Sequence, residues 1–237
     1  MKIKTPALIT WQKTIILTHL TDTLEFKKID ERKIKITRIK GYKIPTNDKN
    51  PVFRAAAEIQ KMKPNKLGVE IRITKNIPSS CGLNSMSGNA AGTILVLDKM
   101  WNFKLSRKKM YEIASKINPE TVQIQKLHFE PLAQNKKYVI IIIPKYIKTD
   151  RIWLKKKTKI GKTMESVAME YFPDLRTISE VLEKYGFKSI GMSGKGPSLF
   201  GFSDKPIILK QIKKELKCKT EFMWYGKTCN KWGKLLE

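Results

Sequence analysis

The amino-acid sequence predicts an α+β fold, and three observations lead to this prediction. Segments that alternate apolar and polar residues, as half-buried strands do, are interleaved with segments whose apolar residues recur every three or four positions, as in helices. The chain has 237 residues, of which 41% are hydrophobic, so it can bury a substantial core. Its longest apolar run, Val139 to Ile143, is far below the ~20 residues that span a bilayer, so no membrane partner is expected.

The first half of the chain is expected to supply strands and then helices. Strand patterns occupy residues 15–17, 23–26, 33–39 and 69–73. A helix is predicted from Pro51, with Asn50 as its N-cap, because proline at the first helical position loses no hydrogen bond. The residues expected to share the buried face of this helix are Val52, Ala55, Ala56, Ile59 and Met62.

Residues 75–101 read as a strand, a loop of small residues and a helix of about 13 residues that starts at Asn89. A helix capped by Ser106 is expected over 106–117, and a buried strand over 138–143. Helices are expected over 177–184 and 207–216, with a glycine-rich turn between short strands within 189–202. The predicted division is an N-terminal domain of residues 1–137 and a C-terminal domain of residues 138–237.

The charge balance leaves two interpretations open. The chain has 48 Lys+Arg against 21 Asp+Glu, a formal net charge of +27. Lysine greatly outnumbers arginine, which is the residue that contacts bases and phosphates through two hydrogen bonds, so a compositional origin is favoured over a nucleic-acid partner. The aromatic residues Trp224, Tyr225 and Trp232 lie among lysines and either stack on nucleobases or belong to a closing strand and surface helix.

The three cysteines lack metal-ligand spacing, which fits reduced thiols, and with no secretory signal pattern a cytoplasmic location is expected.

The loop before the predicted helix at Asn89 has the character of an anion site. The N–H groups of a first helical turn lack intrahelical partners, and the helix dipole is positive there. Gly82, Gly88 and Gly92 allow close backbone approach, while Ser85, Ser87 and Asn89 add hydrogen-bonding groups. By these properties alone, such a loop is as often a structural turn as a phosphate site.

The residues Pro78-x-x-x-Gly82-Leu83-x-x-x-Ser87-x-Asn89-Ala90-Ala91 resemble the phosphate-binding motif of the GHMP kinases, and Gly191 to Phe200 resembles the C-terminal motif of that family. With Lys75-Asn-Ile-Pro78, the likeness is greatest to the branch that phosphorylates 4-diphosphocytidyl-2-C-methyl-D-erythritol in isoprenoid precursor biosynthesis. The resemblance implies a ribosomal protein S5 domain 2-like N-terminal domain, a ferredoxin-like C-terminal domain, ATP between them, and phosphoryl transfer to an alcohol of a small molecule. It implies a monomer or homodimer, with Mg²⁺ as second cofactor and Ser87 as its hydroxyl ligand. The residues it assigns to ATP are Pro78, Ser79, Ser80, Cys81, Gly82, Leu83, Asn84, Ser85, Met86, Ser87, Gly88, Asn89, Gly194, Lys195 and Gly196.

The chain departs from the family at positions that do chemistry. Leu8 stands where the family has a lysine, and Lys13, Lys4 and Lys195 are the candidates to replace that cation. Glu120 stands where the family has its catalytic aspartate. The resemblance therefore implies that Glu120 is one catalytic residue and that Lys13, as the replacement for the family lysine, is the other. Glu120 could instead be an acid that favours the dipole of a helix start.

Two further losses concern the ligands. The cytosine-stacking Gly-Tyr-His segment has no counterpart between residues 17 and 22, and the family's loop glycines are replaced at Ser79, Ser80, Cys81, Asn84, Ser85 and Met86. Two hypotheses follow. The chain is an ATP-dependent kinase with an altered site, or it keeps the fold and binds nucleotide or a partner without transferring phosphate.

Overall fold

The computed structural model describes residues 1–12, 14–62, 68–129, 137–147 and 163–236, and its strands form one continuous mixed sheet. The strand order is β3-β4-β2-β8-β5-β7-β6, with β1 between β2 and β9. The strands are β1 (Lys2–Trp11), β2 (Thr14–Ile29), β3 (Ile34–Gly41), β4 (Gly68–Lys75), β5 (Tyr138–Pro144), β6 (Lys188–Met192), β7 (Leu199–Ser203), β8 (Thr220–Cys229) and β9 (Lys234–Leu236).

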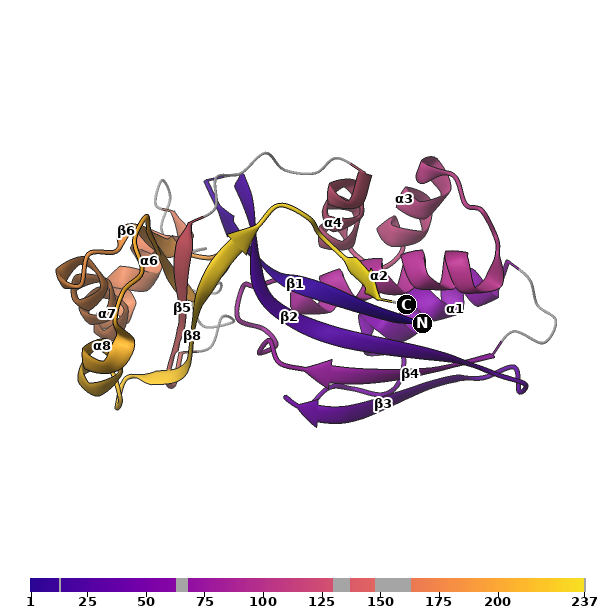
Figure 1. Cartoon of the computed structure of the whole chain (residues 1–237), viewed down its shortest axis with the longest axis horizontal. Helices are drawn as coiled ribbons and strands as arrows, with labels where there is room; N and C mark the ends of the chain where they lie inside the picture. Colours follow the sequence, from indigo (N-terminus) through magenta and orange to yellow (C-terminus); the bar gives the residue numbers. More distant parts are fainter. Residues whose placement is uncertain (13, 63–67, 130–136, 148–162, 237) are drawn as a thin grey trace.

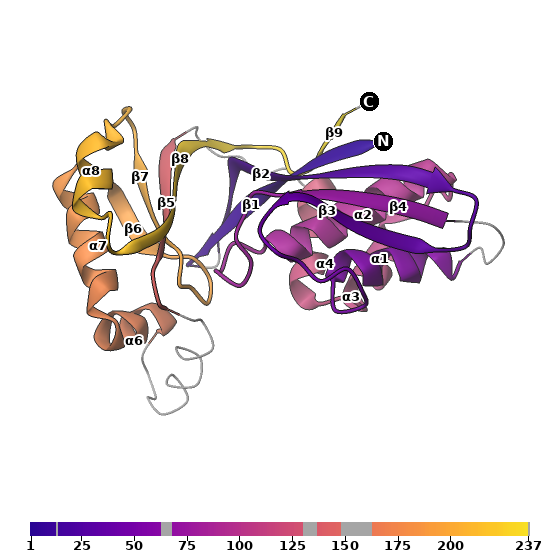
Figure 2. The same cartoon turned by 90° about the horizontal axis from the view of Figure 1, so that it is seen from below.

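Two groups of helices cover this sheet, one on each half of the molecule (Figure 1). The helices are α1 (Pro51–Gln60), α2 (Ser85–Trp101), α3 (Arg107–Ser115), α4 (Pro119–Phe129), α6 (Met164–Tyr171), α7 (Pro173–Lys184) and α8 (Leu209–Glu215). The first four lie on one face of β1–β4, and the last three lie against β5–β7 at the other end (Figure 2). The α+β prediction is therefore confirmed. None of the helices in the described ranges has the length and apolar character needed to span a membrane.

Several predicted elements are confirmed with their caps. The Asn50 Oδ1 accepts from the backbone N–H of Val52 at 2.9 Å, so α1 begins as expected. The Ser106 Oγ accepts from the N–H of Lys109 at 3.2 Å and caps α3. Met62 was wrongly assigned to the buried face, because α1 ends at Gln60 and the Met62 side chain is 39% exposed.

Other boundaries differ from the prediction for identifiable reasons. Helix α2 begins at Ser85 rather than Asn89, because Asn84 adopts a left-handed conformation (φ 48°) that turns the chain into the helix four residues earlier than expected. Helix α7 begins at Pro173 rather than Thr177, with proline at its first position. The patterns at 15–17 and 23–26 belong to one strand, β2, because Thr21 and Asp22 between them also pair with β1 and Thr18 pairs with β8.

Three apolar clusters form the core, and the third lies between the other two. One cluster underlies β1–β4 and α1–α4, and another joins β5–β7 with α6–α8. The third contains Ala7 and Ile9 of β1, Ile77 and Leu83 of the small-residue loop, and Phe200 of β7, among others. The small-residue loop is thus anchored where the two halves of the molecule meet.

The end of the chain returns to its beginning. Strand β8 pairs with β5 and also with β2, through Leu17↔Cys229 and Thr18↔Thr228. Strand β9 then pairs antiparallel with β1, which brings the two termini together (Figure 1). The division at residue 137 stays a prediction, and these pairings show that the last residues pack with the first half of the chain.

Candidate functional site

The loop between β4 and α2, together with the first turn of α2, lines a surface hollow. The residues that line the hollow are Pro78, Ser80, Cys81, Gly82, Leu83, Asn84, Ser85, Met86 and Ser87. Asn84 occupies the N-cap position of α2 without a side-chain cap, and its Nδ2 donates to the Thr10 Oγ1 at 3.2 Å. The first-turn N–H groups of α2 therefore remain available at the hollow, where the positive end of the helix dipole favours an anion.

The second glycine-rich turn, residues 193–198, is bonded directly to this loop. The Ser193 Oγ donates to the carbonyl of Gly82 at 2.8 Å, and the N–H of Ser198 donates to the carbonyl of Cys81 at 3.2 Å. Gly82 has a φ of +84°, and a Cβ there would lie 2.2 Å from the carbonyl oxygen of Ser193. The close contact of the two turns thus requires glycine at position 82.

Strand β1 supports both turns from below. The N–H of Leu8 donates to the carbonyl of Leu83 at 3.1 Å, and the N–H of Gly194 donates to the carbonyl of Thr10 at 2.7 Å. The N–H of Thr10 in turn donates to the Ser193 Oγ at 3.1 Å. Three segments far apart in the sequence are in this way joined into one rigid unit around the hollow.

The structure describes the surroundings of Leu8 and of two of the three lysines that are candidates to replace the family lysine. Leu8 is fully buried and lies in the core beside Gly88 of α2. Lys4 is exposed and precedes the inward-facing Thr5, so it lies on the opposite face of the sheet from α2, and the hypothesis that it replaces the cation is wrong. Lys13 lies outside the described residues. Lys195 is exposed within the second glycine-rich turn, and its role stays a prediction.

A fully buried ion pair lies beneath the loop between β4 and α2. The Lys75 Nζ donates to the Asp22 Oδ2 at 2.8 Å, to the Ser85 Oγ at 2.9 Å and to the carbonyl of Ile77. Both charged side chains are 0% exposed. Burial lowers the pKa of the Lys75 ammonium, and the neighbouring Asp22 carboxylate opposes that shift.

The other side of this pair connects to α2 and β1. The Asp22 Oδ2 also accepts from the Asn89 Nδ2 at 3.0 Å, and the Thr5 Oγ1 donates to the Asn89 Oδ1 at 2.5 Å. Asn89 is 0% exposed and Ser85 is 4% exposed. The expectation that these two side chains offer hydrogen bonds to a ligand is therefore wrong, because both are bonded within the protein interior.

Ser87 differs from them, because its side chain lies in the first turn of α2 and is only half-buried. Its Oγ donates to the Asn118 Oδ1 at 3.2 Å, and the same oxygen accepts from the N–H of Thr121 at 2.7 Å. The Thr121 N–H can only donate, so the Asn118 atom is the carbonyl oxygen and the Ser87 hydroxyl must give it a hydrogen. The lone pairs of the Ser87 oxygen are consequently left for another group.

Glu120 lies in the first turn of α4, two residues after Asn118, and is half-exposed. Within the described ranges, no lysine or arginine forms an ion pair with its carboxylate. Its position in the helix agrees with both interpretations of this residue, the catalytic one and the favourable interaction with the helix dipole.

Cys81 lies at the base of the hollow and is buried, with its Sγ donating to the carbonyl of Pro78 at 3.1 Å. Burial raises the pKa of the Cys81 thiol. It therefore acts as a small side chain that fills the loop and is poorly suited to be a nucleophile.

Sequence reasoning missed Asp22, Asn118 and Ser193 as site-forming residues. A signal existed for Asp22, because it continues the inward period of Leu20, Leu24 and Phe26 in β2. The sequence also carried a signal for Asn118, because Asn118 precedes Pro119 as Asn50 precedes Pro51, which is the same N-cap pattern. Ser193 lies within the Gly191 to Phe200 motif, but nothing in the sequence indicates its partner Gly82, which is 111 residues away.

The aromatic residues near the C-terminus are part of the packed interior. Trp232 is 3% exposed and belongs to the core under β1–β4. Tyr225 stacks on Tyr138 with ring centroids 5.9 Å apart, and Trp224 packs against the cluster between the two halves. These side chains therefore form no exposed platform for nucleobases.

Comparisons with known proteins agree with this geometry. Residues 50–128 match the family model of the GHMP kinases N terminal domain, and residues 144–220 match that of the GHMP kinases C terminal domain. A 4-diphosphocytidyl-2-C-methyl-D-erythritol kinase of Syntrophus aciditrophicus is 29% identical, over 77% of each chain. One of Thermoanaerobacter pseudethanolicus is 26% identical, over 92% of this chain and 87% of the relative.

Solved structures show the same fold. A crystal structure of 4-(cytidine 5'-diphospho)-2C-methyl-D-erythritol kinase superposes with a TM-score of 0.75 at 16% identity, over 96% of this chain and 99% of the other. The mevalonate kinase of Methanococcus jannaschii gives a TM-score of 0.69 at 16% identity, over 97% and 98% of the two chains. The two family models together cover about two thirds of the chain, in the order the family has them. The chain belongs to the GHMP kinases, a family of ATP-dependent phosphotransferases.

Proposed function

We propose that the protein transfers the γ-phosphoryl group of ATP to an alcohol of 4-diphosphocytidyl-2-C-methyl-D-erythritol. The observation that carries the proposal is the hollow at the start of α2, where the first-turn N–H groups have no side-chain cap and the lining loop is bonded to the second glycine-rich turn. The names of the relatives in Syntrophus and Thermoanaerobacter support this acceptor. The sequence resemblance in Lys75 to Pro78 points to the same branch of the family.

The residues of the hollow have separate tasks in this reaction. The N–H groups of Ser85, Met86 and Ser87 would hold the phosphates, and the helix dipole would stabilise their charge. The Glu120 carboxylate would orient the acceptor hydroxyl and take its proton, which requires a free and accessible carboxylate. Lys195 would contribute the positive charge that a lysine provides in the family at the position of Leu8.

The chain also offers suitable ligands for Mg²⁺. The Ser87 oxygen has its lone pairs free, and hydroxyl and carboxylate oxygens are the ligand type that Mg²⁺ prefers. No cluster of three or more acidic, histidine or cysteine side chains suited to a metal occurs among the described residues. This fits an ion held by one or two protein groups together with substrate phosphates and water. Bound Mg²⁺ would neutralise charge that develops on the transferred phosphoryl group.

A second candidate function is nucleotide binding without phosphoryl transfer. Two observations favour it: the residue in place of the family lysine is the buried Leu8, and no described cation is paired with Glu120. Phosphoryl transfer depends on charge placed within about an ångström, so loss of a cation can abolish turnover while leaving ATP binding intact.

One pair of measurements on the purified protein separates these functions. ATP binding is measured by calorimetry with Mg²⁺, and ADP release is measured with 4-diphosphocytidyl-2-C-methyl-D-erythritol, with homoserine and mevalonate as comparison acceptors. Binding together with release for the first acceptor alone supports the proposal. Binding without release for any acceptor supports the second candidate, and release with mevalonate or homoserine alone contradicts the proposed acceptor.

A further inference from the structure

The loop between β4 and α2, residues 76–84, is called the phosphate loop here because of its proposed function. The buried pair of Lys75 and Asp22 contacts both ends of this loop, yet neither side chain is exposed to solvent. Lys75 is the last residue of β4, and Asp22 lies near the middle of β2, paired with Thr5 of β1. Each is 0% exposed, so neither side chain can contact a ligand in the hollow. A charged pair placed here must act on the surrounding protein.

Both charged groups have all their hydrogen-bonding capacity satisfied. The three N–H groups of the Lys75 ammonium meet three acceptors: Asp22, the Ser85 hydroxyl and the carbonyl of Ile77. The Asp22 carboxylate accepts four hydrogen bonds, two at each oxygen. A fully satisfied buried network of this kind fixes the positions of its members, whereas one missing partner leaves a charge that is costly to bury.

The partners of the pair lie on opposite sides of the loop. On the entry side, the Asp22 Oδ1 accepts from the N–H groups of Asn76 and Ile77 at 2.8 and 2.9 Å. On the exit side, Lys75 holds Ser85 and Asp22 holds Asn89, both in the first two turns of α2. The distance between the two ends of the loop is thus set by one rigid ion pair.

We propose that Lys75 and Asp22 are positioning residues that hold the phosphate loop in the shape required for nucleotide. This inference rests on the proposed function, because it assigns the loop to ATP phosphates. The loop has serine, cysteine and asparagine where the family has glycine, and its backbone N–H groups bind phosphate only when the loop geometry brings them together. The pair supplies that geometry in the absence of ligand.

The test removes both charges together. The double variant Lys75→Met/Asp22→Asn leaves no unpaired buried charge, so it is expected to unfold at a urea concentration near that of wild type, unlike Asp22→Asn alone. Its affinity for ATP is expected to fall at least tenfold. In the nucleotide-free protein, amide hydrogen exchange at residues 76–88 is expected to rise, while exchange in β5 and β7 stays unchanged.

A matched control is the exposed pair of Lys2 and Glu25, which joins β1 and β2 at 2.8 Å. The variant Lys2→Met/Glu25→Gln also removes one lysine and one carboxylate, and it is expected to keep wild-type ATP affinity and exchange. Any change seen only in the buried double variant then reflects its place beneath the loop rather than the loss of a charge pair.

If the buried double variant does not fold, Ser85→Ala tests the same connection more gently, since it removes only the hydrogen bond from Lys75 to α2. Its affinity for ATP is expected to fall about threefold to tenfold, with faster exchange over residues 84–88. Wild-type ATP affinity and exchange in a folded double variant, or in Ser85→Ala, overturn the inference. Failure of the wild-type protein to bind ATP is a different result, which contradicts the proposed function.

Discussion

Glu120 lies half-exposed at the start of α4, beside the Asn118 that holds the Ser87 hydroxyl. Under the proposed function, replacing the carboxylate by an amide of the same shape removes the proton acceptor. Glu120→Gln is therefore expected to lower turnover by about 10²–10⁴-fold. Because the phosphates are bound by the loop of α2, the affinity for ATP is expected to stay within a few-fold of wild type, as calorimetry can measure.

The control for this substitution is Glu112→Gln on the neighbouring helix α3. Glu112 is exposed and forms an ion pair with Lys109 at 3.0 Å, away from the hollow. Turnover of this variant is expected to equal that of wild type. If Glu120→Gln also turns over at the wild-type rate, Glu120 has no part in the proton transfer and serves only the helix dipole.

Gly82 permits a second test at a single residue, because the chain has a matched glycine elsewhere. Gly82 and Gly186 have nearly the same φ, +84° and +85°, but a Cβ at Gly186 would meet nothing within 4 Å. Gly186→Ala is expected to cost roughly 1–2 kcal/mol of unfolding free energy, from backbone strain alone.

Gly82→Ala adds a clash to the same strain, since its Cβ would lie 2.2 Å from the Ser193 carbonyl oxygen. We expect it to cost more than Gly186→Ala in urea unfolding and to weaken ATP binding, which Gly186→Ala leaves unchanged. Equal costs for the two variants, with ATP affinity retained in both, would mean that the two glycine-rich turns are not tightly held together.

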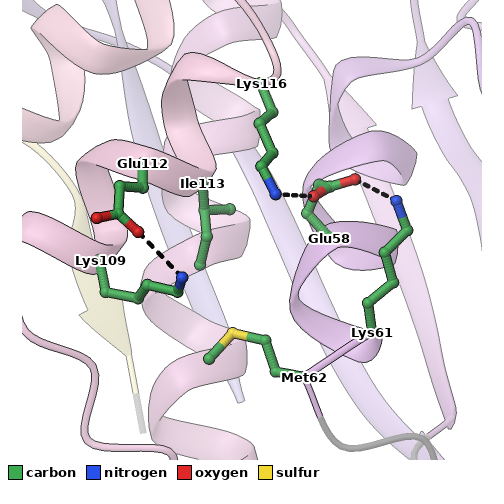
Figure 3. A pocket seen from close by; sticks show the side chains of 7 residues that line it. All are labelled: Glu58, Lys61, Met62, Lys109, Glu112, Ile113 and Lys116. Atoms are coloured by element: carbon green, nitrogen blue, oxygen red, sulfur yellow. Dashed lines mark hydrogen bonds and ion pairs between the residues drawn. The ribbon is translucent and has the colours of Figure 1, made fainter.

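Between elements, a surface ion-pair network joins α1 to α3. Figure 3 shows Glu58 of α1 between Lys61 and Lys116. The Lys116 Nζ lies 3.0 Å from the Glu58 carboxylate. The hydrogen bond from Lys61, followed by that from Lys116, lowers the pKa of Glu58 below its ordinary value of 4.5. The ionised carboxylate is thus the form that the folded protein favours.

The sign of the pH dependence follows from that direction. A lowered pKa in the folded state stabilises the protein above the ordinary value, and this stabilisation is lost as the pH falls through the folded-state pKa. At pH 7, Glu58→Gln is expected to cost about 0.2–1 kcal/mol of unfolding free energy, the range of exposed pairs. In urea unfolding the difference from wild type should shrink in acid, and a constant difference at every pH would contradict the assignment.

The elements also show which structural features local sequence could predict. Asn50 with Pro51, and Ser106, mark helix starts by chemistry confined to a few residues, and both were found at their predicted positions. The start of α2 was missed, because Asn84 makes no side-chain cap that a local pattern would signal, and its side chain bonds instead to Thr10, which is distant in the sequence. Local signals therefore predicted the starts of α1 and α3 and missed the start of α2 at the site.

The site was predictable to a smaller extent for the same reason. The motif of small residues located the loop, but Asp22 and Lys75 are 53 residues apart and Gly82 and Ser193 are 111 apart. The alternation of apolar residues along β2 and β4 predicts that Asp22 and Lys75 point to the buried side of the sheet. It does not show which residues they contact. The support beneath the loop became visible only once the strands were placed side by side.

At the scale of the whole molecule, the tail after β8 connects the C-terminal half to the phosphate loop. Trp232 lies between β8 and β9, is 3% exposed, and belongs to the same core cluster as Leu8. Its Nε1 would lie 3.9 Å from a Cβ on Gly88, in the first turn of α2. The last residues of the chain therefore pack directly behind the helix start that faces the hollow.

This placement predicts that a substitution at the end of the chain affects both stability and nucleotide binding. Trp232→Ala is expected to lower the unfolding free energy by about 3–5 kcal/mol, as for other buried tryptophans, and to weaken ATP binding because α2 loses packing. Leu235→Ala is the control, since Leu235 lies in the same tail but is 37% exposed. It should change neither quantity appreciably in urea unfolding and calorimetry. If Trp232→Ala destabilises the protein but binds ATP as wild type does, the tail contributes to the core alone and α2 holds its position without it.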